Sequence, residues 1–287
     1  MTYLILSILC SVAVSVLLKV ARRQGIDIRQ AIAFNYVMAC ALTWFLLAPS
    51  LEPKAGHQFP WLLFAILGVI LPVLFVIMSR GVEYAGIVRA DAAQRLSLFL
   101  TVLASFVLFG EALSVNRGLS LALAFAALFC LLCKPADTTP GINVRQGALY
   151  LFLIWLGYGV VDMLFKQIAK TGTAFSSGLF LSFVLAGVIM FGYLLVRRTQ
   201  WNGRSVVGGL ILGLLNFCNI LFYIRAHQTF HESPTLVFTI MNIGVISLGT
   251  IVGAVLFREK ISRINLLGIA LAIIAVLTLY YWTVISG

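Results

Sequence analysis

The chain has 287 residues, of which 62% are hydrophobic and 10% are charged, and its mean hydropathy is +1.07. Soluble domains contain about 25% charged residues, so this composition excludes a soluble globular protein and indicates a membrane protein. The net charge of +11 does not indicate a nucleic-acid partner, because the basic residues stand singly or in pairs between apolar runs. Such a distribution is typical of loops that face anionic membrane lipid.

Ten apolar runs are long enough to cross a bilayer as helices. A membrane-spanning helix needs about 20 apolar residues and satisfies its own backbone hydrogen bonds in lipid. The predicted spans are, in chain order, Thr2–Val20, Gln30–Leu47, Trp61–Met78, Gly86–Phe109, Val115–Cys133, Ala148–Ile168, Ala174–Leu195, Val206–Phe222, Pro234–Phe257 and Ile264–Ile285. The sequence therefore predicts an all-α membrane protein with ten transmembrane helices.

The two halves of the chain are similar to each other. The segment Phe109–Ser114 closes the fourth apolar run, and Phe257–Ser262 closes the ninth run 148 positions later. Lys19, near the end of the first run, has a counterpart in Lys166. This self-similarity indicates a duplication, and an odd number of spans in each copy inverts the second copy relative to the first. The predicted division is a first five-helix repeat over residues 1–134, a linker over 135–144 and a second five-helix repeat over 145–287.

The distribution of basic residues predicts the orientation of the chain in the membrane. They follow the first and third spans in one half and the seventh and ninth spans in the other, so the inversion places them on one face. Because cytoplasmic loops are enriched in Lys and Arg, we expect this face to be cytoplasmic and both termini to lie outside. The residues are Lys19, Arg22, Arg23, Arg29, Arg80, Arg89, Arg197, Arg198, Arg204, Arg258, Lys260 and Arg263.

The repeated motif resembles that of a known family. Each predicted repeat has a long fourth helix that ends in Glu-x-Leu/Ile-Ser, at Glu111 and Glu259, before a close fifth helix. This pattern resembles the EamA-type permeases of the drug/metabolite transporter superfamily over nearly the whole chain. The resemblance implies a secondary transporter of small metabolites that works by alternating access.

The chain departs from that family pattern at several places. Family members often carry a proline in the fourth helix of each repeat, where Leu98 and Ile246 stand here. An arginine often opens the second helix, where this chain has Asn35. Family members are also usually drawn with both termini inside, whereas the basic residues here predict termini outside.

Arg95 is the main candidate for substrate binding. It lies nine residues into the predicted fourth helix. Inserting a charge at the centre of a membrane helix costs about 2.5–3.5 kcal/mol, so a charged residue at this depth usually has a function. Its guanidinium would bind a carboxylate or phosphate. Alternatively, Asp91 lies four residues earlier and is placed to pair with it.

Polar amides are the next candidates. Gln94 and Asn242 occupy corresponding positions of the two predicted repeats, and Asn216 and Asn219 lie three residues apart on the eighth span. We expect these four residues to line a polar substrate site between the repeats. Hydrogen bonds that hold neighbouring helices together are the alternative interpretation.

Asp162 and Lys166 repeat the acid-then-base spacing on the sixth span. A carboxylate at that depth is a candidate proton-coupling residue, and an ion pair between the two side chains is the alternative. Glu111 and Glu259 are predicted to be structural turn residues, because a carboxylate favours the N-terminus of the helix that follows.

No metal site or cofactor is predicted. His227 and His231 have the spacing that places two imidazoles on one face of a helix, but both fall in a predicted loop and no third ligand is evident. No motif of a hydrolase or kinase is convincing, so we do not expect an enzyme.

The sequence thus predicts a multi-pass permease of the bacterial inner membrane that acts on a small polar metabolite, amino-acid-like or another organic solute. Its expected partners are the substrate, membrane lipid and protons as coupling ion, in a monomer or homodimer. The alternatives are a flippase for a lipid-linked or amphiphilic substrate and a non-transporting membrane scaffold. A wet central cavity indicates a permease, a lipid-facing one a flippase, and a closed apolar interior a scaffold.

Overall fold

The apolar runs form helices in the computed structural model of the protein, which describes residues 1–21, 23–50, 60–100, 103–104, 115–132, 144–170, 174–230 and 234–285. Its helices are α1 (Thr2–Ala21), α2 (Ile28–Leu47), α3 (Trp61–Ala85), α4 (Ile87–Leu96), α6 (Val115–Leu132), α7 (Val144–Lys170), α8 (Phe175–Val196), α9 (Gly203–Thr229), α10 (Pro234–Leu256) and α11 (Arg263–Ile285). No strand occurs in these ranges. The prediction of an all-α protein is confirmed.

Seven of the described helices are long and apolar enough to cross a membrane, namely α1, α2, α3, α7, α8, α9 and α10. Shorter apolar stretches lie in α6 and α11. The chain is therefore a multi-pass membrane protein, as its composition predicts.

The helix ends differ from the prediction mainly at three places. α3 continues to Ala85 and α9 continues to Thr229, because the polar residues at their ends keep the helical backbone bonds. The prediction that His227 lies in a loop is therefore wrong, since this residue lies in α9. The fourth span is interrupted, because α4 ends at Leu96 and a turn follows at Ser97.

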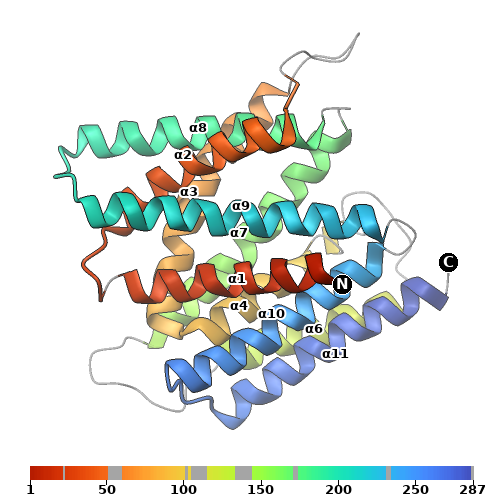
Figure 1. The fold of residues 1–287 in the computed structure, drawn as a ribbon. Helices are drawn as coiled ribbons and strands as arrows, with labels where there is room; N and C mark the ends of the chain where they lie inside the picture. Colours follow the sequence, from red (N-terminus) through yellow and green to blue (C-terminus); the bar gives the residue numbers. More distant parts are fainter. Residues whose placement is uncertain are drawn as a thin grey trace.

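The helices are arranged as a series of neighbours. Figure 1 shows α8, α2, α9 and α1 side by side, and α10 and α11 continue the series beyond α1. α6 packs along α11, while α3 and α7 pack against each other. The start of α1 and the end of α11 lie at the same end of the bundle (Figure 1).

Glycines allow the closest of these contacts, between α2 and α9. A methyl group on Gly209 would lie 2.5 Å from the Ala31 carbonyl oxygen, and one on Gly213 would lie 2.6 Å from the Asn35 carbonyl oxygen. The two helix backbones therefore meet directly, as small residues at four-residue spacing permit in membranes.

Candidate functional site

A polar stripe runs along α1 in an otherwise apolar helix. Ser7, Ser11, Ser15 and Lys19 recur at every fourth residue and therefore lie on one face of the helix. Ser7 and Ser15 are buried. Because buried hydroxyl groups need hydrogen-bond partners, this stripe locates the polar interior of the bundle.

The stripe on α1 faces α4. The Arg95 Nη2 donates to Ser11 Oγ at 2.7 Å, and Ser15 Oγ donates to Asp91 Oδ1 at 2.6 Å. The contacts run in opposite directions along the two helices, so α1 and α4 are antiparallel here. The predicted hydrogen-bonded pair between Asp91 and Arg95 is absent among the described residues, because each side chain bonds a serine of α1 instead.

A cavity of about 240 Å³ opens beside this contact. Its lining residues come from α4, α7, α8, α9 and α10 and from the turn that follows α4: Gln94, Arg95, Ser97, Leu98, Tyr158, Asp162, Phe175, Asn219, Ile220, Tyr223, Ile224, Met241 and Asn242. Five residues that the sequence marks as candidates thus line a single cavity, namely Gln94, Arg95, Asp162, Asn219 and Asn242.

The Arg95 guanidinium is only partly satisfied by the protein. Its Nη2 bonds Ser11, whereas its Nε is buried and has no hydrogen-bond partner. A buried donor without a partner is costly, and a ligand oxygen in the cavity would satisfy it. Arg95 is therefore the clearest candidate among the cavity residues for binding an anion.

Asp162 brings a negative charge to the same cavity from α7. Its side chain is exposed to that space, although it lies in the middle of an apolar helix. The side chain of Lys166 lies outside the described residues, so the predicted ion pair is not described. The cavity is thus lined by one basic and one acidic side chain, Arg95 of α4 and Asp162 of α7.

Asn216 lies outside this cavity, unlike Asn219. Its Nδ2 lies 3.4 Å from Asn35 Oδ1, at the close contact of α2 and α9. Asn219 instead lines the cavity and accepts a hydrogen bond of 2.8 Å from Ser7 Oγ at its Oδ1. Asn216 and Asn219 therefore contact different neighbours, Asn35 of α2 and Ser7 of α1, and of the two only Asn219 lines this cavity.

The sequence-based prediction names Tyr158 only as a weaker candidate and does not name Tyr223. Tyr158 and Tyr223 line the cavity from α7 and α9 and place phenol groups near Arg95 and Asp162. Nothing in their local sequence distinguishes them from the aromatic residues that pack against lipid. The four-residue spacing of the α1 serines, in contrast, is visible in the sequence and marks the face of α1 that meets Arg95.

The interruption of α4 adjoins the cavity. The Ser97 N–H donates to the Gln94 carbonyl and the Leu100 N–H donates to the Ser97 carbonyl, so the backbone tightens to three-residue bonds here. The Leu96 carbonyl accepts a bond of 3.1 Å from Trp155 Nε1 on α7. This indole gives the carbonyl a partner outside the helix and fixes the interruption in place.

Lys19, at the other end of the α1 stripe, contacts the second half of the chain. Lys19 forms an ion pair with Glu259, which follows α10. Glu259 also accepts hydrogen bonds from the first N–H groups of α4, from Ile87 at 2.9 Å and from Val88 at 3.4 Å. The Glu259 carboxylate thus caps the positive end of α4.

This arrangement corrects the prediction for Glu259, which caps α4 of the other half and not the helix that follows it. A methyl group on Gly86 would lie 2.6 Å from Glu259 Oε2, so glycine at this position admits the carboxylate. The next helix, α11, is capped by Ser262, whose Oγ accepts from the Asn265 N–H at 3.1 Å. The motif residue Glu111 lies outside the described residues.

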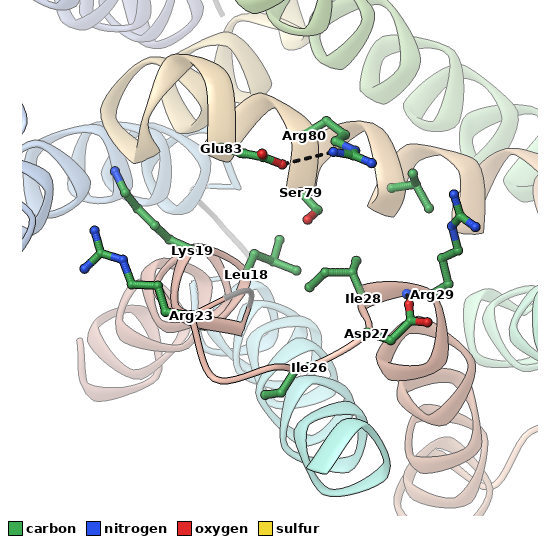
Figure 2. A pocket seen from close by; sticks show the side chains of 11 residues that line it. Leu18, Lys19, Arg23, Ile26, Asp27, Ile28, Arg29, Ser79, Arg80 and Glu83 are labelled. Atoms are coloured by element: carbon green, nitrogen blue, oxygen red, sulfur yellow. Dashed lines mark hydrogen bonds and ion pairs between the residues drawn. The ribbon is translucent and has the colours of Figure 1, made fainter. Parts of the chain in front are cut away.

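A larger cavity of about 490 Å³ lies between the ends of α1, α2 and α3. Figure 2 shows Arg29 on one side of it, Lys19 and Arg23 on the other, and the ion pair of Arg80 with Glu83 on α3. Gln30 of α2 bonds Gln200 and Asn202, which places the basic loop before α9 at the same end. Basic residues from both halves thus gather at one end of the bundle.

Metal-binding groups do not gather in the described part of the chain, where no three His, Cys, Asp or Glu side chains lie close enough to hold an ion. His227 donates a hydrogen bond of 3.1 Å from its Nδ1 to the Tyr223 carbonyl oxygen inside α9. His231, its expected partner, lies outside the described residues.

Comparison with known proteins assigns the family. Residues 1–133 match the EamA-like transporter family. Residues 1–133 of the chain therefore belong to the EamA-like transporter family. A protein of Haemophilus influenzae with no assigned function is 54% identical over 286 residues, which cover 97% of each chain. A protein of known crystal structure has the same fold, with a TM-score of 0.56, 14% identity and 96% of each chain covered.

Membership of this transporter family gives the polar cavity its context. The family and the apolar helices together establish a membrane transporter, and the substrate has to be inferred from the cavity.

Proposed function

We propose that this protein is a secondary active transporter that moves a small polar solute across the bacterial inner membrane by alternating access. The observation that carries this proposal is the cavity of about 240 Å³ with Arg95, whose Nε lacks a partner, at its wall. Its volume lies just below the range of about 300–1,000 Å³ of drug-sized sites, which favours a small metabolite. Transport, and no catalytic reaction, is the proposed role.

The charges of the cavity indicate how the solute would be held. Arg95 would bind a carboxylate or phosphate of the solute, and Asp162 would face a cationic group or exchange protons. Gln94, Asn219 and Asn242 would bind the remaining polar atoms. An amino-acid-like solute fits this distribution, because it carries both charges within a few ångströms.

We further infer that the chain consists of two inverted five-helix repeats, as the duplication predicts. Exchanging the halves converts α1, α2, α3, α4 and α6 into α7, α8, α9, α10 and α11. The contacts of α1 with α9, α2 with α9 and α1 with α10 then become those of α7 with α3, α8 with α3 and α7 with α4, all of which occur. This correspondence supports the proposed symmetry, which is typical of alternating-access transporters.

Alternating access needs a closed end, and the contact of Lys19, Glu259 and the start of α4 fits this role. The cavity lies toward the start of α1, where Ser7 and Ser11 contact its lining residues. The ion pair lies two turns of α1 beyond Ser11, at the basic end of the bundle. We propose that this contact separates in the opposite conformation and exposes the solute to the basic, cytoplasmic side.

The test is transport by the purified protein in proteoliposomes across a panel of amino acids, organic acids and sugar phosphates, with and without a proton gradient. Arg95→Ala is expected to abolish uptake of the solute that the wild type transports, and Arg95→Lys to retain part of it. Arg225→Ala, an exposed arginine of α9, is the matched control and should transport normally. Normal transport by Arg95→Ala would overturn the site. Movement of labelled phospholipid without solute transport would establish a flippase, and neither movement would favour a scaffold.

A further inference from the structure

Asp91 is a buried carboxylate that does not line the cavity and has no role in the proposed binding of the solute. Its residue is 2% exposed and it is absent from the cavity wall. Oδ1 accepts one hydrogen bond from Ser15 at 2.6 Å, and Oδ2 is buried without any partner. An ionised carboxylate in such surroundings is costly, since each of its oxygens can accept two bonds.

The groups around Asp91 come from four elements. On α4, Arg95 lies one turn away and is the nearest positive charge, while the Glu259 carboxylate lies beyond the start of the helix and repels it. α1 presents Ser15 and, one turn further, Lys19, which is paired with Glu259. α7 presents the Tyr158 phenol. α10, which contains no charged residue, packs Gly249 against Oδ2, where a methyl group would lie 2.9 Å from that oxygen.

Among the described residues, only Arg95 therefore compensates the negative charge of Asp91, and Arg95 is also the proposed anion-binding group of the cavity. When a solute carboxylate binds Arg95, the guanidinium charge is shared with it and compensates Asp91 less. The side chain of Asp91 is then favoured in its neutral, protonated form. Binding of an anionic solute and binding of a proton thus promote each other, and by linkage the promotion is equal in both directions.

We propose that Asp91 is the proton-binding site that couples proton movement to solute transport. The proposal rests on the proposed function, because it requires a solute anion at Arg95. One proton from the water on one side of the membrane binds the free Oδ2 and converts the carboxylate into a carboxylic acid. After the conformational change the same proton leaves to the other side as the solute dissociates. No electrons are exchanged, and Ser15 keeps its bond to Oδ1 throughout.

The position of Asp91 suits this role better than that of Asp162. Asp162 is exposed to the cavity, where a solute cation can compensate its charge and water can solvate the ionised form, so that no proton is needed. Asp91 of α4 instead bonds Ser15, which lies on the α1 stripe between the cavity contact at Ser11 and the closed contact at Lys19. A proton held there is separated from both solutions in the conformation described.

The first test needs no solute. Infrared difference spectra of the lipid-reconstituted protein would follow the carbonyl stretch of a buried carboxylic acid as the pH changes. We expect a band that is present in the wild type and in Asp162→Asn, and that is lost in Asp91→Asn. In Arg95→Gln the band should appear at a higher pH, because the compensating charge is gone. Asp27→Asn, which keeps the cap of α2, is the control. A band that survives in Asp91→Asn, or is lost in Asp162→Asn, would overturn the proposal.

The second test measures coupling with the solute that the transport panel identifies and with a pH-sensitive dye inside the liposomes. We expect the ratio of proton-driven accumulation to solute exchange to fall about tenfold or more in Asp91→Asn. An unchanged ratio would refute Asp91 as the coupling site while leaving the transporter intact. The proposed function is tested separately, by the loss of transport in Arg95→Ala. That result does not depend on the infrared behaviour of Asp91. Thermal unfolding and size-exclusion profiles confirm that each variant is folded.

Discussion

Lys19 and Glu259 form an ion pair although 240 residues separate them in the chain. The pair joins the end of α1 to the segment after α10, and the same carboxylate caps the start of α4. Three helices of the two halves therefore meet at one buried group. This is the place where separation of the halves would be opposed by electrostatics.

We predict that Lys19 and Glu259 stabilise the described conformation cooperatively. The variants Lys19→Met, Glu259→Gln and their double mutant should give a coupling free energy of about 1–3 kcal/mol in thermal unfolding, because both side chains are largely buried. The more exposed pair of Arg80 with Glu83 is the control and should couple by about 0–1 kcal/mol. Additive effects of the two Lys19 and Glu259 variants would show that the contact does not hold the halves together.

Gly213→Ala should destabilise the contact of α2 with α9. The added methyl group would lie 2.6 Å from the Asn35 carbonyl oxygen, so the helices must separate, at a cost of about 1–3 kcal/mol. Gly192→Ala on α8 is the matched control, because its methyl group would meet no atom within 4 Å. Thermal unfolding of the purified variants measures both. Equal stability of the two variants would mean that the helices do not pack this closely.

The two asparagines of α9 should separate in their effects on transport and stability. Asn219→Ala is expected to raise the half-saturating solute concentration about three- to tenfold, through loss of a polar contact in the cavity. Asn216→Ala should lower the unfolding temperature and leave the half-saturating concentration within about twofold, because Asn216 bonds Asn35. The reverse pattern would place the solute at the α2 contact.

Trp155→Phe should weaken the interruption of α4. It removes the indole N–H that bonds the Leu96 carbonyl and leaves that buried oxygen unpaired, at a cost of about 1–3 kcal/mol. Transport should slow as well, because Arg95 adjoins the interruption. Trp44→Phe, at a residue that is 47% exposed, is the control and should change stability by less than about 0.5 kcal/mol. Unchanged stability and rate in Trp155→Phe would assign no role to this hydrogen bond.

The fold class and most helix ends were predictable from local sequence. A run such as Phe175–Val196 is so apolar that only a membrane helix accommodates it, whatever its neighbours are. The interruption of α4 at Ser97 was not predictable, because no proline or glycine marks it. It depends on the Trp155 indole, which a different helix supplies.

The residues of the candidate site were likewise predictable in part from the sequence and in part only from the structure. Burial of a charge is costly anywhere in a membrane, so Arg95 and Asp162 are conspicuous in the sequence without any knowledge of their partners. The tertiary structure alone decided that Asn219 lines the cavity while Asn216 bonds Asn35, and that Glu259 caps α4 of the other half. Hydropathy and spacing are properties of one helix, whereas the partner of a polar side chain depends on which helix packs against that face.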